Sequence, residues 1–283
     1  MRIECCYNCG ERNRSYYAEE NGYTLVKCDG CGLLYLENRP LNEEITQAHK
    51  QGKHHGIKEL NATGVFLDHK ITRYLEILDD IYRGKVSHIH SWLDVGCGHG
   101  EFIAALQQYH PEIERVCGTE PNIYKQASAR ERGLDVGYFD IEKHEKTYDV
   151  ISLLNVYSHL PDPPEFLKIL KGKLNPGGEL ILETGDTAEL NAKDHYRPFL
   201  LPDHLSFASE KIVVDILERT GFEIISIHRY PYWLFNIKNL VWECMMALHP
   251  RHQSKLKYLL NRKLYSESDL YIRARVVSME PDS

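Results

Sequence analysis

The stretch SWLDVGCGHGEF, residues 91–102, decides the fold of this chain. An apolar run ends at Gly96, two further glycines follow at positions 98 and 100, and a helical pattern begins directly afterwards. Glycine has no side chain and adopts positive φ readily, so such a turn lets a ligand approach bare backbone at the end of a buried strand. A tight strand-to-helix turn without a ligand is the alternative interpretation.

The residues after this turn alternate between strand and helix patterns. Strands are expected at 89–96, 115–120, 148–156, 178–184, 222–230 and 269–277, and helices at 101–109, 123–133, 163–174 and 209–221. Such alternation predicts parallel strands joined by helical crossovers on both faces of one sheet. Residues 231–268 are expected to form a helical insertion before the last strand.

A carboxylate follows the second strand of this series. Glu120 ends the stretch VCGTEP, about twenty residues after the glycine turn. A carboxylate in that place can accept hydrogen bonds from the two hydroxyls of a ribose. The turn contains no G-x-x-x-x-G-K-S/T motif and no basic residue. We therefore expect a ligand with a ribose and without a pyrophosphate.

Several motifs resemble those of the class I S-adenosylmethionine-dependent methyltransferases. These are LDVGCGHGEF, GTEPN, YDVISLLNVYSHLPDP, LKGKLNPGGELILET and HLSFASEKIVVDILERTGFEI. They occur in the order of that family and span residues 89–230, with the final strand in addition. The resemblance implies an α/β fold with a doubly wound, seven-stranded, mostly parallel sheet. It also implies an enzyme that uses S-adenosylmethionine as its cofactor.

The resemblance assigns the cofactor contacts by position. Asp94 and Gly96 would contact the methionyl end, and Gly98 and Gly100 would let the turn wrap the cofactor. Glu120 would hold the two ribose hydroxyls. Asp140 and Ile141 would lie along the adenine, and Asn155 would border the sulfonium. Asp140 is equally well interpreted as a solvated carboxylate in a turn.

Two cysteine pairs of identical spacing stand near the N-terminus: Cys6-x-x-Cys9 and Cys28-x-x-Cys31. Four thiolates complete a tetrahedral shell around zinc and leave no position for a substrate, so the chemistry predicts a structural zinc site. A redox pair is the alternative. The arrangement resembles a zinc-binding module that precedes some methyltransferases of sugar, surface-glycan and specialised-metabolite pathways.

The expected organisation has five parts. Residues 1–40 form a zinc ribbon, 41–88 a helical connector or lid, 89–230 the methyltransferase core, 231–268 the helical insertion, and 269–283 the final strand and tail.

Two of the 15 histidines are candidates for the chemistry. The stretch PDHLSFAS resembles HEHFSYFS of sugar C-methyltransferases, which places His204 at a catalytic position. His159 follows the fourth strand, in the stretch NVYSHLPDP. A histidine can remove the proton of a hydroxyl acceptor near neutral pH. His204 could also bind substrate or serve packing, and Asp203 could orient it or cap a turn. His54 and His55 are expected in a solvated loop; the alternative is a mobile loop that closes over the site.

C-methylation is disfavoured by two departures from the sugar C-methyltransferases. Leu201 stands where those enzymes have a tyrosine, and their long C-terminal domain is missing from this sequence. The favoured prediction is therefore O-methylation of a sugar, a glycan precursor or another small metabolite. C- or N-methylation of a nucleotide-linked sugar is one alternative.

Bulk composition restricts the other function classes. The net charge is −7, which argues against a nucleic-acid partner. An RNA base methyltransferase that holds RNA with its zinc module is therefore a weaker alternative. A non-catalytic module that binds the cofactor or a partner is another, and the intact glycine turn with Glu120 argues against it. Neither a signal peptide nor an apolar stretch of membrane-spanning length is visible in the sequence, so we expect a cytoplasmic protein.

Overall fold

The computed structural model describes residues 1–84, 86, 88–195, 197–231 and 268–277. The predicted helical insertion at 231–268 lies outside these residues except at its two ends. In the part of the chain described, no helix is both long enough and apolar enough to cross a membrane.

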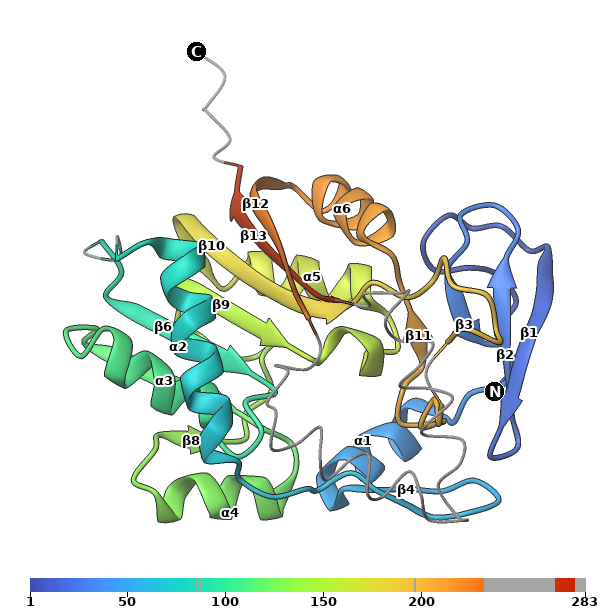
Figure 1. Cartoon of the computed structure of the whole chain (residues 1–283), viewed down its shortest axis with the longest axis horizontal. Helices are drawn as coiled ribbons and strands as arrows, with labels where there is room; N and C mark the ends of the chain where they lie inside the picture. The colour runs from blue at the N-terminus through green and yellow to red at the C-terminus, as the bar shows by residue number, and fades with distance from the viewer. Residues whose placement is uncertain (85, 87, 196, 232–267, 278–283) are drawn as a thin grey trace, which may run out of the picture.

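A seven-stranded sheet forms the centre of the molecule, in the order β12-β13-β10-β9-β6-β7-β8 (Figure 1). Its strands are β6 (Ser91–Val95), β7 (Arg115–Thr119), β8 (Val136–Gly137), β9 (Tyr148–Leu154), β10 (Leu174–Gly185), β12 (Phe222–Pro231) and β13 (Ser268–Val276). The strands from β10 to β8 pair in parallel, whereas β13 runs antiparallel to both β10 and β12. The predicted doubly wound, mostly parallel sheet is confirmed.

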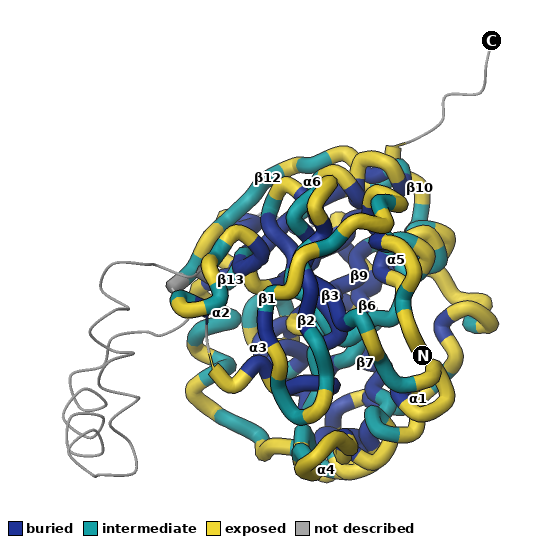
Figure 2. Tube along the Cα trace, turned by 90° about the vertical axis from the view of Figure 1, so that its right-hand side faces the viewer, coloured by how far each residue is buried: buried dark blue, intermediate teal, exposed yellow. Residues whose placement is uncertain are grey.

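Helices cover both faces of this sheet (Figure 1). They are α2 (Asp68–Tyr82), α3 (Glu101–Tyr109), α4 (Ile123–Glu131), α5 (Pro163–Lys171) and α6 (Glu210–Arg219). The period of two along a strand directs successive side chains to opposite faces. Trp92 and Val150 therefore pack with α2 and α3, while Leu93 and Ile151 pack in the cluster that contains α5 and α6. Figure 2 shows β6 and β9 buried between these layers.

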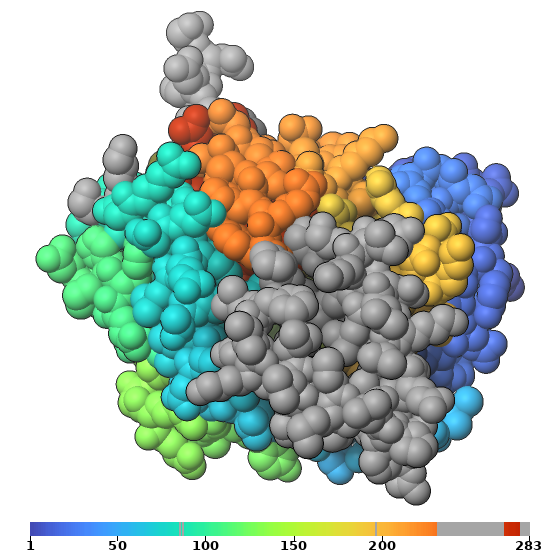
Figure 3. Space-filling view, viewed as in Figure 1, coloured from blue at the N-terminus to red at the C-terminus, as the bar shows by residue number. Residues whose placement is uncertain are grey.

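The N-terminal residues form a second sheet that includes a short strand from the segment between β10 and α6. Its order is β1 (Arg14–Glu20), β2 (Tyr23–Cys28), β3 (Leu34–Leu36) and β11 (Ser206–Phe207). Strand β11 pairs antiparallel with β3. Figure 3 shows the blue N-terminal residues along one flank, next to the yellow segment near residue 190. The N-terminal module thus shares both a sheet and an apolar core with the rest of the chain.

The connector between the two sheets is less helical than predicted. Helix α1 (Asn42–Gln51) ends at Gly52, whose φ of 67° is the left-handed conformation typical of a helix C-terminus. A two-stranded hairpin of β4 (Lys53–His54) and β5 (Leu60–Asn61) follows before α2. The expected helical connector over 41–88 thus consists of two helices, α1 and α2, with this hairpin between them.

The carboxylate of Glu20, at the end of β1, attaches the N-terminal module to the loop before β11. It accepts hydrogen bonds from the backbone N–H groups of Phe199, at 2.8 Å, and Leu201, at 3.2 Å. Both of these residues are buried. Without the carboxylate, two donors would lose their partners inside the protein.

We therefore expect Glu20→Ala to lower the free energy of unfolding by about 1–3 kcal/mol, the cost of unpaired buried polar groups. Chemical denaturation measures the change. The matched control is Glu19→Ala, an exposed neighbour on the same strand. Equal effects of the two substitutions would contradict this role of Glu20.

Candidate active site

A cavity of about 800 Å³ lies at the carboxyl ends of β6, β7 and β9. Its wall combines the glycine turn after β6, Glu120 after β7 and Asn155 after β9 with residues of α1 and of the loop 62–67. Ligands of open parallel sheets bind at this edge, where the loops after adjacent strands separate.

The three glycines of the turn meet three different requirements. All have positive φ: 70° at Gly96, 59° at Gly98 and 91° at Gly100. A Cβ atom at Gly96 would collide with Val156, and one at Gly100 with Leu134, whereas Gly98 has open space around it. Gly96 and Gly98 line the cavity, but Gly100 only precedes the first residue of α3. The ligand-facing backbone is therefore that of 96–98.

Glu120 lies against this turn, as the sequence predicts. Its Oε2 accepts a hydrogen bond from the Gly98 N–H at 2.8 Å, and its Oε1 accepts one from the Asn122 N–H at 2.8 Å. The side chain is buried. Each carboxylate oxygen has more than one lone pair, so both can still accept a hydrogen bond from a ligand hydroxyl.

A second buried carboxyl group, Asp94, lies on the same wall. It accepts a hydrogen bond from the Ser152 hydroxyl at 2.5 Å. Burial raises the pKa of Asp94 to about 7, although the bond from Ser152 opposes the shift. A positively charged group in the cavity would favour the ionised carboxylate and lower this pKa again.

The remaining predicted cofactor residues also line the cavity. Ile141 is buried, whereas Asp140 is exposed and pairs with Lys143 at 3.1 Å. Asn155 is exposed and has a φ of 56°, which places it in the left-handed region directly after β9. The apolar side chain of Ile141 and the polar side chain of Asp140 thus both line the cavity.

His159 and His204 also line the cavity, with ring centroids 4.8 Å apart. The Nδ1 atom of His204 lies 2.9 Å from the carbonyl oxygen of Phe199. Because a carbonyl only accepts, Nδ1 carries the hydrogen and Nε2 keeps a free lone pair. Burial lowers the pKa of His204 to about 4, so the ring is neutral at neutral pH.

Asp203 does not orient His204, which corrects one of the sequence interpretations. Its Oδ1 lies 3.0 Å from Nδ1 of His159 and 3.1 Å from Nε2 of His54. His204 bonds to the backbone of Phe199 instead. Burial lowers the pKa of His159, but the Asp203 carboxylate more than offsets this and the net shift is upward.

Two histidines that carried no motif signal join this group. His54 was expected in a solvated loop, yet it is buried; only His55 matches that expectation, with a side chain 71% exposed. His49, on α1, lines the cavity near His159, at a ring-centroid distance of 6.0 Å. Both histidines belong to the segment formed by α1 and β4. Tertiary packing places this segment against the cavity, so no local sequence pattern reveals it.

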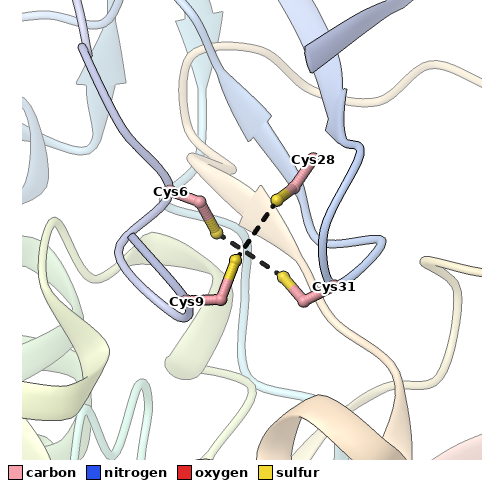
Figure 4. A group of neighbouring side chains, drawn as sticks. All are labelled: Cys6, Cys9, Cys28 and Cys31. Atoms are coloured by element: carbon pink, nitrogen blue, oxygen red, sulfur yellow. Dashed lines mark hydrogen bonds between the residues drawn. The ribbon is translucent and has the colours of Figure 1, made fainter. Parts of the chain in front are cut away.

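The four predicted cysteines lie together in the N-terminal module (Figure 4). Their sulfur atoms are all within 4.8 Å of one another, with Cys6 and Cys31 3.6 Å apart and Cys9 and Cys28 3.5 Å apart. These separations are far too long for disulfides. They are close to the spacing of about 3.8 Å that a tetrahedral zinc site with Zn–S bonds near 2.3 Å requires.

The N-terminal module also supports the histidine side of the cavity. The Tyr7 hydroxyl, between the first two cysteines, donates to Ser206 Oγ at 3.0 Å and lies 3.5 Å from the Tyr157 hydroxyl. The Leu36 N–H donates to the carbonyl of Leu205 at 3.0 Å. The contacted residues lie one or two positions from His204 and His159 in the sequence.

Comparisons with known proteins agree with this architecture. The model of a family described as "Methyltransferase domain" matches residues 53–227. A SAM-dependent methyltransferase from Archaeoglobus fulgidus superposes with a TM-score of 0.51 and 19% identity, over 72% of this chain and 94% of that one. Coclaurine N-methyltransferase gives a TM-score of 0.52 and 17% identity, over 75% of this chain and 74% of that one. At these identities the structures indicate a shared fold.

Curated relatives match over a shorter stretch. The tRNA U34 carboxymethyltransferase of Nautilia profundicola is 34% identical over 103 residues, which are 32% of this chain and 33% of that protein. The ubiquinone biosynthesis O-methyltransferase of Colwellia psychrerythraea is 29% identical over 99 residues, 32% of this chain and 40% of that protein. The chain therefore spans two-fifths or less of the length of these two relatives.

The glycine turn generates a stability prediction. Gly96→Ala adds a methyl group against Val156 and forces alanine into positive φ, so we expect a loss of about 2–4 kcal/mol in the free energy of unfolding. Gly98→Ala has only the conformational cost, about 1 kcal/mol. In the Gly96→Ala background, Val156→Ala should restore part of the stability. If it restores none, the collision with Val156 does not limit this position.

Proposed function

Because the chain belongs to the methyltransferase domain family and is an S-adenosylmethionine-dependent methyltransferase, we propose that it methylates an oxygen atom of a small molecule. The acceptor class is a sugar, a glycan precursor or another small metabolite. The observation that carries this proposal is that the neutral His204 lines the same cavity as the glycine turn, with its Nδ1 hydrogen bonded to Phe199 and the lone pair of Nε2 left to accept a proton. The relatives named for O-methylation in ubiquinone biosynthesis support transfer to oxygen.

The residues at the sheet edge fit this cofactor. We assign the ribose hydroxyls to Glu120, which two backbone N–H groups already orient. The methionyl end and its positive charge fit the buried Asp94 and the bare backbone from Gly96 to Gly98. The adenine fits between Asp140 and Ile141, and Asn155 borders the sulfonium. Gly100 serves the start of α3 in this assignment rather than a cofactor contact.

S-adenosylmethionine, when bound, supplies an electrophilic methyl group on a good leaving group. The chain itself has to hold the acceptor oxygen in line with that group and remove its proton. Nε2 of His204 takes the hydroxyl proton, while the bond from Nδ1 to Phe199 holds the ring in place. General-base catalysis of this kind contributes about 10²- to 10⁴-fold.

We further propose that Cys6, Cys9, Cys28 and Cys31 bind a structural zinc ion, with residues 1–40 as the zinc ribbon and 89–230 as the methyltransferase core. The ion takes no part in the transfer, because four sulfur ligands leave no open position. The ion would affect function indirectly. It would stabilise the module whose Tyr7 and strand β3 contact the segment next to His204.

Methylation of an RNA base is the second candidate. The relative named as a tRNA carboxymethyltransferase favours it. RNA binding requires phosphate neutralisation, and residues 1–40 contain five Lys or Arg against six Asp or Glu. Methyl-labelled S-adenosylmethionine incubated with phenols, sugars, nucleotide sugars and total tRNA tests both candidates. We expect label in a methyl ether; label in tRNA alone would overturn the proposal.

Two substitutions should separate the cofactor side from the acceptor side. We expect Glu120→Gln to weaken S-adenosylmethionine binding at least about tenfold, since it removes the charge that holds the ribose hydroxyls. Calorimetry measures this affinity. His204→Gln should leave the affinity unchanged and lower kcat by about 10²-fold once an acceptor is found. A variant at position 204 with full kcat would show that another group takes the proton.

Metal analysis of the purified chain tests the zinc site. We expect one zinc ion per chain, lost in Cys9→Ser together with a lower thermal midpoint, because metal binding stabilises a small module with little core of its own. The matched control is Cys5→Ser, since Cys5 is exposed and outside the group of four. Zinc loss in both variants, or in neither, would contradict the assignment.

A further inference from the structure

A second group of side chains that could bind a metal ion lines the cavity, next to His204. His49 comes from α1, His159 from the turn η1 (Tyr157–His159), and Asp203 from the loop before β11. One donor atom of each lies within 4.8 Å of the others, and all three residues line the cavity. The three donors therefore converge from segments that are distant in sequence.

His49 has a buried ring nitrogen with unused bonding capacity. Its Nε2 is shielded from solvent and has no hydrogen-bond partner among the described residues. A polar atom left in this state costs about 1–3 kcal/mol. The ring faces His54 at a centroid distance of 5.3 Å and His159 at 6.0 Å. An ion or a ligand atom at this place would remove the cost.

The donor set selects a class of ion. Two imidazole nitrogens and one carboxylate oxygen suit Mn²⁺, Fe²⁺, Co²⁺, Ni²⁺ or Zn²⁺, whereas Mg²⁺ and Ca²⁺ prefer oxygen ligands. Three protein ligands leave coordination positions open for a substrate, in contrast to the four cysteines of the N-terminal module. Asp203 supplies the only carboxylate of the group, and its negative charge partly neutralises a divalent ion.

The neighbours of Asp203 complete the arrangement. His54 is buried, and its Nε2 lies 3.1 Å from Asp203 Oδ1, so it can hold the carboxylate in place. Such hydrogen bonds to ligand side chains orient metal sites. The hydrogen that His159 shares with Asp203, at 3.0 Å, is released when both side chains bind the same ion.

We propose that His49, His159 and Asp203 bind a divalent transition-metal ion that holds the hydroxyl group of the acceptor. This inference rests on the proposed O-methylation. The ion polarises the hydroxyl and makes it more acidic. The hydroxyl proton passes to Nε2 of His204, and the oxygen electron pair forms the new O–CH₃ bond as the C–S bond of the cofactor breaks. The electrons of that bond remain on sulfur.

Cobalt binding to the full, zinc-loaded chain tests the site. We expect one Co²⁺ per chain beyond the zinc, with the weak visible bands of nitrogen and oxygen ligands. In His49→Gln the affinity should fall at least about 100-fold, while His55→Gln, an exposed neighbour of the group, should bind normally. Unchanged S-adenosylmethionine affinity in both variants shows that they are folded.

Three results would overturn the metal site: no cobalt binding at roughly 1 mM, far weaker than a specific site requires; equal binding by His49→Gln; or only the strong near-ultraviolet absorption of cobalt bound to thiolates. The last shows exchange at the cysteines instead. None of them affects the proposed function, because cofactor affinity is measured without added metal and label transfer is measured both with and without it. Conversely, cobalt can bind as expected even if the acceptor is methylated at nitrogen or carbon.

Discussion

The site depends on one buried carboxylate that joins the ends of two adjacent strands. Glu120 accepts hydrogen bonds from the N–H of Gly98, after β6, and of Asn122, before α4. A buried polar group without partners would be strongly unfavourable, so these bonds stabilise both the side chain and the turn that donates to it. The bare backbone and the charged group that a nucleoside needs are therefore parts of one structure.

The histidine side of the cavity depends on the N-terminal module. Strand β3 pairs with β11, Glu20 holds the preceding loop, and Tyr7 bonds to Ser206. Because His204 lies between these attachments, its position is determined by residues that begin the chain. The N-terminal module thus shares one apolar core with the segments that carry His204 and His159.

Features encoded within short stretches were predictable. The glycine turn, the carboxylate of Glu120 and the paired cysteines each follow from local spacing, and the alternation of strands and helices predicted the parallel sheet. Prediction was wrong where neighbours in sequence point to different partners. Asp203 contacts His159 and His54 rather than the adjacent His204, and His54 is buried rather than solvated.

By itself, the sequence determined the class of fold, the cofactor and the residues at the sheet edge, because periodicity and turn chemistry act over a few residues. Only the tertiary structure decided which histidines gather around Asp203. His49 and His54 reach Asp203 across about 150 residues of chain, and this meeting depends on how α1 and the β4–β5 hairpin pack against the core. No local pattern encodes such a contact, since it results from the burial of many side chains at once.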